Sequence, residues 1–118
     1  MNRTYYMLNS NIKHKFNAKS TIVDGIRFDS KIESRYFEKL MLLKKSGEIL
    51  FFLRQVPFHL PGNIRYLVDF VEFYAPKNNH QGDVVFTDVK GYMTNMSKLK
   101  IKQVESIYGI DINIVKKV

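Results

Sequence analysis

The spacing of apolar residues predicts a helix between Ser30 and Gly47. Apolar residues recur there at intervals of three and four, as on one face of a helix. Ser30 suits an N-cap, with Glu33 three residues later as in a capping box, and Gly47 suits the position just after the last turn. The residues predicted to form the apolar face are Ile32, Tyr36, Phe37, Leu40 and Leu43.

Three apolar runs after this helix predict three strands. They cover residues 49–60, 64–74 and 83–90, and a polar loop over residues 76–82 makes the last two a hairpin. Pro57 lacks a backbone N–H, so we expect it to limit pairing near the end of the first strand. Within residues 64–74, the run around Asp69 from Leu67 to Val71 is apolar on both faces, which indicates a central, buried strand.

The remaining segments predict a second helix, a last strand and a short hairpin. Thr94 or Asn95 caps a helix that runs to about Tyr108, and residues 111–118 form the last strand. Asp24-Gly25 marks a tight turn within residues 22–28. The order from residue 30 is therefore helix, three strands, helix, strand, which favours a mixed α/β fold with helices packed on a mixed central sheet.

Composition is typical of one soluble globular domain. The 118 residues suit a single core, with a polar, basic arm over residues 1–20 and one domain over residues 21–118. The chain contains no long apolar run, no secretory signal and no Cys, so we expect a cytoplasmic protein without a membrane span or disulfides. The net charge of +8 favours a polyanionic partner, which can be DNA, RNA or an anionic membrane surface. The alternative is a basic protein without such a partner.

Asp69 is the most informative acidic residue, because it lies inside the apolar run of the central strand. An unpaired carboxylate buried there lowers the stability of the fold by roughly several kcal/mol or has a shifted pKa. It therefore requires a cation, a set of hydrogen-bond donors or a cleft. The alternative to a functional role is that Asp69 accepts backbone N–H bonds at a bulge.

Asp88 and Lys90 lie two apart on the next strand, so they share a face. A hairpin centred near residues 78–80 places Asp88 beside Asp69. Two adjacent carboxylates repel unless a cation lies between them, and Mg²⁺ prefers oxygen ligands, to which the Val89 carbonyl adds one. Lys90 would then position an attacking water or hold a phosphate. The alternative is a solvated ion pair between Asp88 and Lys90.

Glu33 borders the apolar face of the first helix, whereas Glu38 points toward solvent on the helical wheel. The simplest role of Glu33 is to form the capping box with Ser30. If it also points toward the sheet, three carboxylates and one lysine converge in a set suited to metal-assisted phosphodiester hydrolysis.

In this order of motifs the chain resembles the PD-(D/E)XK nuclease superfamily, whose core is helix, three strands, helix, strand. More closely, the chain resembles a family of small phage-encoded nucleases likened to Holliday-junction resolvases. The segments that carry this resemblance are Val23–Lys31, Glu33, Gln55-Val56-Pro57, Asp69-Phe70 and Asp88-Val89-Lys90-Gly91. Val68 stands where the superfamily usually has Pro, and Asp88 replaces the commoner Glu.

The resemblance implies a restriction-endonuclease-like core and a Mg²⁺-dependent endodeoxyribonuclease, with Mn²⁺ as an alternative ion. It implies that Glu33, Asp69 and Asp88 bind the metal and that Lys90 is the catalytic lysine. It also implies a phage protein of DNA recombination, acting in the bacterial cytoplasm on a Holliday junction or other branched DNA. Two symmetric cuts require two sites, so a homodimer is expected.

Five further residues are candidates for DNA contact: Gln55, Tyr92, Lys98, Lys100 and Lys102. Lys98 and Lys102 share a helix face, while Lys100 lies on the other side. The alternatives are edge-strand packing for Gln55, core covering for Tyr92 and a solvated helix face for the lysines. For the whole protein, the alternatives to a nuclease are an inactive nucleic-acid-binding module and a protein-binding regulator on the same fold.

Overall fold

The structure, a computed structural model, describes residues 20–118, so the arm predicted over residues 1–20 lies, apart from Ser20, outside the described residues. The described elements are β1 (Thr21–Val23), β2 (Ile26–Phe28), α2 (Lys31–Ser46), β3 (Ile49–Leu60), β4 (Ile64–Tyr74), β5 (Val84–Val89), α3 (Asn95–Tyr108) and β6 (Ile112–Val115). From residue 30 onward this is the predicted order of helix, three strands, helix and strand.

The protein is a mixed α/β protein with a four-stranded sheet in the order β3-β4-β5-β6. β3, β4 and β5 run antiparallel through consecutive hairpins, whereas β6 pairs parallel with β5. A parallel pair needs a crossover connection, and α3 supplies it. β1 and β2 form a separate two-stranded hairpin, as the Asp24-Gly25 turn predicted.

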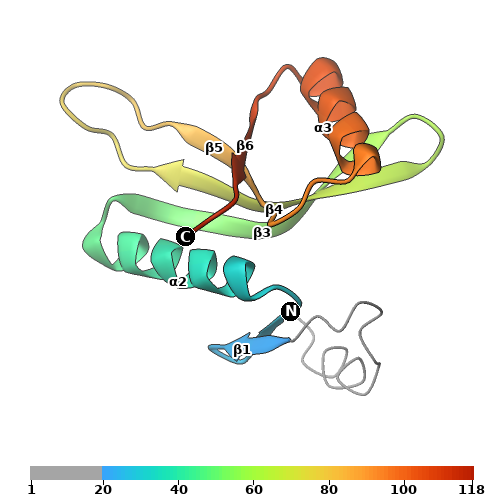
Figure 1. Cartoon of the computed structure of the whole chain (residues 1–118). Helices are drawn as coiled ribbons and strands as arrows, with labels where there is room; N and C mark the ends of the chain where they lie inside the picture. Colours follow the sequence, from blue (N-terminus) through green and yellow to red (C-terminus); the bar gives the residue numbers. More distant parts are fainter. Residues whose placement is uncertain (1–19) are drawn as a thin grey trace.

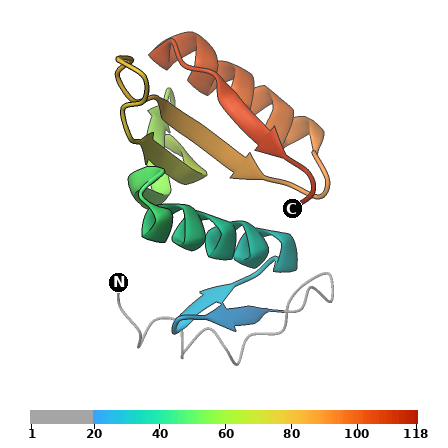
Figure 2. The ribbon, with the colours of Figure 1, turned by 90° about the vertical axis from the view of Figure 1, so that its left-hand side faces the viewer.

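The two helices lie on opposite faces of the sheet (Figures 1 and 2). Figure 2 shows α2 on one side of β5 and β6, with α3 on the other. The β1–β2 hairpin lies against α2 on the side away from these strands (Figure 2). Within residues 20–118, neither helix combines the length and the apolar character that crossing a bilayer requires.

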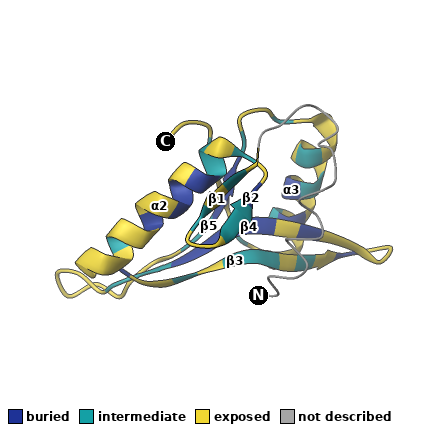
Figure 3. Cartoon of the chain, turned by 90° about the horizontal axis from the view of Figure 1, so that it is seen from below, coloured by how far each residue is buried: buried dark blue, intermediate teal, exposed yellow. Residues whose placement is uncertain are grey.

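α2 begins and ends where its capping residues predict. The Ser30 side chain accepts a hydrogen bond from the Glu33 N–H, and Gly47 ends the helix with φ of 87°. Its buried stripe faces the sheet while the opposite side is exposed (Figure 3). The cluster beneath it, here called the α2 core, consists of Phe28, Tyr36, Phe37, Leu40, Ile49, Phe70 and Val89.

α3 is capped in the same way, by Thr94 at its start and Gly109 at its end. The cluster between this helix and the sheet, here called the α3 core, consists of Leu60, Tyr66, Val68, Ile101, Val104 and Ile112. Burying these side chains on either face of the sheet supplies most of the driving force for the fold.

One expectation about β3 is wrong. Pro57 does not limit pairing, because β3 pairs with β4 through Pro57 opposite Leu67 and on to its last residue. β3 is the edge strand of its sheet. An edge strand tolerates proline because one side of it makes no ladder bonds.

The β3–β4 hairpin changes the helix it packs against at Asp69. Phe70 belongs to the α2 core, yet Val68, two residues earlier, belongs to the α3 core. Residues two apart on a strand normally share a face, so the regular alternation breaks here. The residue opposite on β3 is Gln55, between the pairs Arg54–Phe70 and Val56–Val68, and its φ is 52°. Asp69 thus occupies an irregular point of the sheet.

Candidate active site

Asp69 and Asp88 meet where β4 and β5 separate. The last paired residues are Phe70 and Thr87, and the next level of this register places Asp69 opposite Asp88, as predicted. The Asp69 N–H donates to Asp88 Oδ1 at 2.9 Å, and the Val89 N–H donates to Asp69 Oδ2 at 2.9 Å. Each carboxylate therefore takes the place of a backbone acceptor on the neighbouring strand. Asp69 does accept a backbone N–H, as the alternative to a functional role predicted, and this bond is compatible with a further role.

Asp88 is fully buried, and Tyr66 holds it from the preceding strand. The Tyr66 hydroxyl donates to Asp88 Oδ2. Burial raises the pKa of the Asp88 carboxyl, and the charge of Asp69 adds to this, while the hydrogen bond from Tyr66 and the nearby charge of Lys90 oppose it. Asp88 and Lys90 are thus not a solvated surface pair.

Gln55 reaches the site from β3. Its Nε2 donates to Asp69 Oδ1 at 3.2 Å. Its φ of 52° lies in the left-handed region, which glutamine seldom adopts. The other non-glycine residues of positive φ between 20 and 118 are aspartate or asparagine, in turns and loops: Asp24, Asn63, Asn78 and Asn79. Backbone strain of this kind concentrates at functional sites.

Glu33 points from the first turn of α2 toward Asp69. Burial raises the pKa of its carboxyl from 4.5 to about 8, and both the charge of Asp69 and a hydrogen bond with it add to the rise. Arg54 opposes the rise, with its guanidinium nitrogen 3.8 Å from Glu33 Oε2. Glu38 is exposed, as the helical wheel predicted. Ser30 therefore caps the backbone N–H of Glu33, while the Glu33 side chain joins the site.

Lys90 completes the predicted set at the end of β5. Its ammonium group lies 5.8 Å from the centroid of the Tyr66 ring, on the side of the sheet where Tyr66 holds Asp88. Its backbone N–H donates to the Val115 carbonyl at 2.9 Å, which anchors it to β6. Its charge favours the ionised form of Asp88.

In its chemistry, the donor set suits a hard divalent cation. Glu33, Asp69, Asp88 and the Val89 carbonyl offer oxygen alone, which Mg²⁺ prefers. A cation would also offset the repulsion that raises the pKa of Glu33. In geometry, no three acidic, His or Cys side chains among the described residues form a ready-made metal cage. The four oxygens of Asp69 and Asp88 each accept a hydrogen bond, and each keeps a second lone pair.

The residues predicted to contact DNA separate into two groups. Gln55 is half-buried, with its amide directed to Asp69 rather than to solvent. Tyr92 is 82% exposed, so it does not cover the core, and Lys98 and Lys102 are also exposed, while Lys100 is half-buried. The second group therefore lies on the surface between the end of β5 and the middle of α3.

Two residues of the site escaped the sequence reasoning: Tyr66 and Arg54. Tyr66 stands three positions before Asp69, and the change of packing between Val68 and Phe70 is what brings it to Asp88. Arg54 interrupts the apolar run of β3, which was a usable signal. Its guanidinium carbon lies 4.5 Å from the centroid of the Phe28 ring, and this contact positions the guanidinium group beside Glu33.

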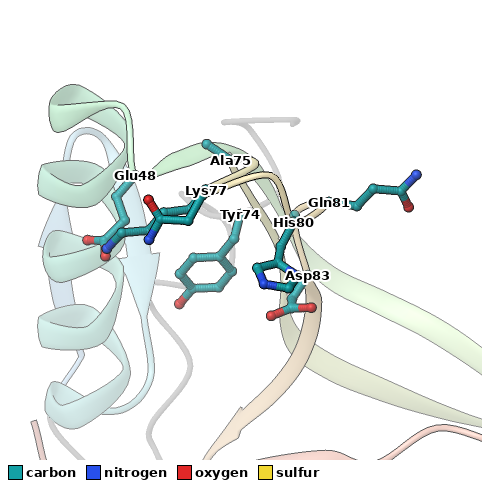
Figure 4. Close-up of a pocket in the computed structure, with 9 residues that line it drawn as sticks. Glu48, Tyr74, Ala75, Lys77, His80, Gln81 and Asp83 are labelled. Atoms are coloured by element: carbon teal, nitrogen blue, oxygen red, sulfur yellow. The ribbon is translucent and has the colours of Figure 1, made fainter.

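A separate hollow of about 380 Å³ lies at the C-terminal end of β4 (Figure 4). Tyr74 forms part of its wall, with Glu48 and Lys77 on one side and His80 and Asp83 on the other (Figure 4). None of the four predicted catalytic residues lines it. The Tyr74 hydroxyl and the Tyr36 hydroxyl both donate to the fully buried Glu72, at 2.9 and 2.7 Å. These bonds satisfy the buried carboxylate, so the tyrosines have a structural role.

The fold and this site define a small mixed α/β protein with buried, interacting carboxylates at a fork between two strands. Residues 13–116 match the family described as "Protein of unknown function (DUF1064)", and the chain belongs to that family. No curated protein matched the chain. No solved structure matched it either.

Proposed function

We propose that this protein is a metal-dependent endonuclease that hydrolyses DNA phosphodiester bonds. The observation that carries the proposal is the fork between β4 and β5, where Asp69 and Asp88 meet and Glu33 faces Asp69. A partly buried carboxyl that faces Asp69 is poorly explained as a device for stability, because desolvation and like charge both act against it. Order of elements and resemblance to the PD-(D/E)XK superfamily support the same conclusion.

In this proposal Glu33, Asp69, Asp88 and the Val89 carbonyl hold Mg²⁺, with Mn²⁺ as an alternative. Bound there, the ion supplies activation of a water and neutralisation of the charge that develops on the phosphate. Tyr66 and Gln55 fix the orientation of the two aspartates through their hydrogen bonds. Lys90 orients the attacking water or holds the scissile phosphate, because its charge lies beside Asp88.

The proposed substrate is branched DNA, such as a Holliday junction, and the proposed form is a homodimer with one site per cut strand. Forks, flaps and plain duplex present the same phosphates, so a panel of DNAs is needed. The basic charge of the chain suits each of them. Cleavage by a phage-encoded enzyme of this kind would take place in the cytoplasm of the bacterial host.

The deciding experiment incubates labelled junction, fork, flap and duplex DNA with the protein in Mg²⁺, Mn²⁺ or EDTA. We expect cleavage with either metal and none in EDTA. Asp88→Asn should abolish cleavage and keep DNA affinity, because it removes one charge and preserves the shape of the side chain. Cleavage by Asp88→Asn at the rate of the unmodified protein would rule the proposal out.

The second candidate is a DNA-binding protein that does not cleave. Its supporting observation is that every oxygen of Asp69 and Asp88 already accepts a hydrogen bond from the protein. This candidate predicts DNA binding in EDTA and no cleavage of any substrate in the panel with either metal. A protein-binding regulator, the remaining alternative, predicts neither DNA binding nor cleavage.

A further inference from the structure

The parallel strands β5 and β6 end at the same edge of the sheet, and each is followed by lysine. β5 ends at Val89, before Lys90, and β6 ends at Val115, before Lys116 and Lys117. In open α/β sheets, ligands bind outside the carboxyl ends of parallel strands. This edge also carries Asp88, so any ligand here adjoins the candidate active site.

The register of the two strands places two of these lysines level with each other. Asp88 pairs with Ile114 and Val89 with Val115, and the Lys90 N–H continues the ladder by donating to the Val115 carbonyl at 2.9 Å. The next level places Lys116 beside Lys90. Neighbours across a ladder project to the same face, so Lys90 and Lys116 share the face of Asp88.

Among residues 20–118, no acidic side chain forms an ion pair with Lys116 or Lys117, and both lysines are exposed. Lys90 has the charge of Asp88 nearby, and that carboxylate belongs to the candidate active site. Like charges side by side on neighbouring strands repel. An anion between Lys90 and Lys116 would remove this repulsion, just as a cation would for the carboxylates two residues earlier.

We propose that Lys116 and Lys117, together with Lys90, bind a backbone phosphate of DNA next to the phosphate that is cleaved. This inference rests on the proposed function, and it gives the path of the DNA strand: across the ends of β5 and β6. The contacts are to phosphate, so they fix the position of the strand and carry no sequence preference. Lys116 and Lys117 are binding residues here, while chemistry is left to the carboxylates and Lys90.

The test compares two double variants that remove the same charge: Lys116→Ala with Lys117→Ala, and Lys44→Ala with Lys45→Ala. Lys44 and Lys45 are exposed and lie in the last turn of α2, at the end opposite Glu33. DNA affinity is measured in EDTA, with labelled duplex, from 50 to about 200 mM salt. Each lost phosphate contact lowers the slope of log affinity against log salt by about 0.9. The first variant loses the contact to one phosphate, so we expect its slope to fall by about 0.9, and that of the second variant to stay unchanged.

Equal slopes for the two variants would overturn the inference, as would a wild-type protein that binds no DNA. Wild-type binding with the expected difference in slope, but no cleavage with any metal, would refute the nuclease and support only the phosphate contact of Lys116 and Lys117, with no cleaved phosphate beside it. Circular dichroism checks that each variant folds. If the alanine pair at residues 116 and 117 does not fold, Lys116→Gln with Lys117→Gln gives the same comparison, since Gln keeps the length and polarity of the side chain.

Discussion

The side chain of Gln55 holds Asp69 while its own backbone is strained. Its amide donates to Asp69 Oδ1 at 3.2 Å, and its φ is 52° in the middle of β3. A non-glycine residue in this conformation costs about 1–3 kcal/mol. The ladder pairs on either side of it, Arg54–Phe70 and Val56–Val68, keep it there. The strain and the hydrogen bond together link the irregular point of the sheet to the proposed site.

Two substitutions of Gln55 should therefore differ in their effect on stability but agree in their effect on cleavage. Gln55→Gly removes the strain and the amide, while Gln55→Ala removes the amide and keeps the strain. We expect the glycine variant to be more stable than the alanine variant by about 1 kcal/mol, from urea unfolding. Both should cleave more slowly than wild type, because Asp69 loses a partner. Wild-type cleavage by either variant would restrict Gln55 to a structural role.

Tyr66→Phe should weaken the site through Asp88. Loss of the hydroxyl leaves one buried oxygen of Asp88 without its donor, which costs about 1–3 kcal/mol of stability. Because that hydrogen bond lowers the pKa of Asp88, its loss raises the pKa further. The pH at which cleavage reaches half its maximum should therefore move upward.

The matched control for this change is Tyr108→Phe. The Tyr108 hydroxyl donates to the His59 carbonyl at 2.7 Å, at the end of β3 away from the site. Its removal should leave the pH profile in place. An identical shift for both variants, or none for Tyr66→Phe, would contradict a role of Tyr66 in orienting Asp88.

Glu33 should make the metal-free protein less stable as the pH rises. Its pKa is about 8 in the folded state against 4.5 for the ordinary carboxyl, so between these values the folded state holds a proton that the unfolded state has released. Stability from this group is complete below about 4.5 and is lost as the pH rises to about 8. Thermal unfolding in EDTA across this range measures it.

Glu33→Gln should flatten this pH dependence and abolish cleavage, whereas Glu38→Gln should change neither. Glu38 lies on the exposed side of the same helix, so its carboxyl has no site to join. An inactive Glu38→Gln with an active Glu33→Gln would reverse the assignment of the helix face. A pH profile of stability that Glu33→Gln leaves unchanged would place the titration elsewhere.

Lys98 and Lys102 should contribute to DNA affinity without affecting the chemistry. Both are exposed and lie one turn apart on α3. We expect Lys98→Ala with Lys102→Ala to weaken binding and reduce its salt dependence, measured by titration of labelled DNA in EDTA. Cleavage at saturating DNA should stay near the wild-type rate. A salt slope equal to that of wild type would remove this helix face from the DNA-binding surface.

Much of the fold could be predicted from local patterns. The caps Ser30 and Gly47 predicted both ends of α2, and the apolar runs predicted β3 and β4 with the observed bounds. Caps and hairpin turns act through hydrogen bonds between residues close in sequence, so their signals are local. The meeting of Asp69 and Asp88 was predictable for the same reason, since one hairpin loop sets their register.

The sequence by itself determined the elements, the burial of Asp69 and its place opposite Asp88. Only the tertiary structure decided that Tyr66 reaches Asp88, that Arg54 stands beside Glu33, and that β6 lies parallel to β5. These contacts join residues of different strands and helices, and they depend on sheet order and on the break in alternation at Gln55. The spacing of apolar residues predicts neither the sheet order nor this break, because periodicity indicates which side chains are buried and not which residues they contact.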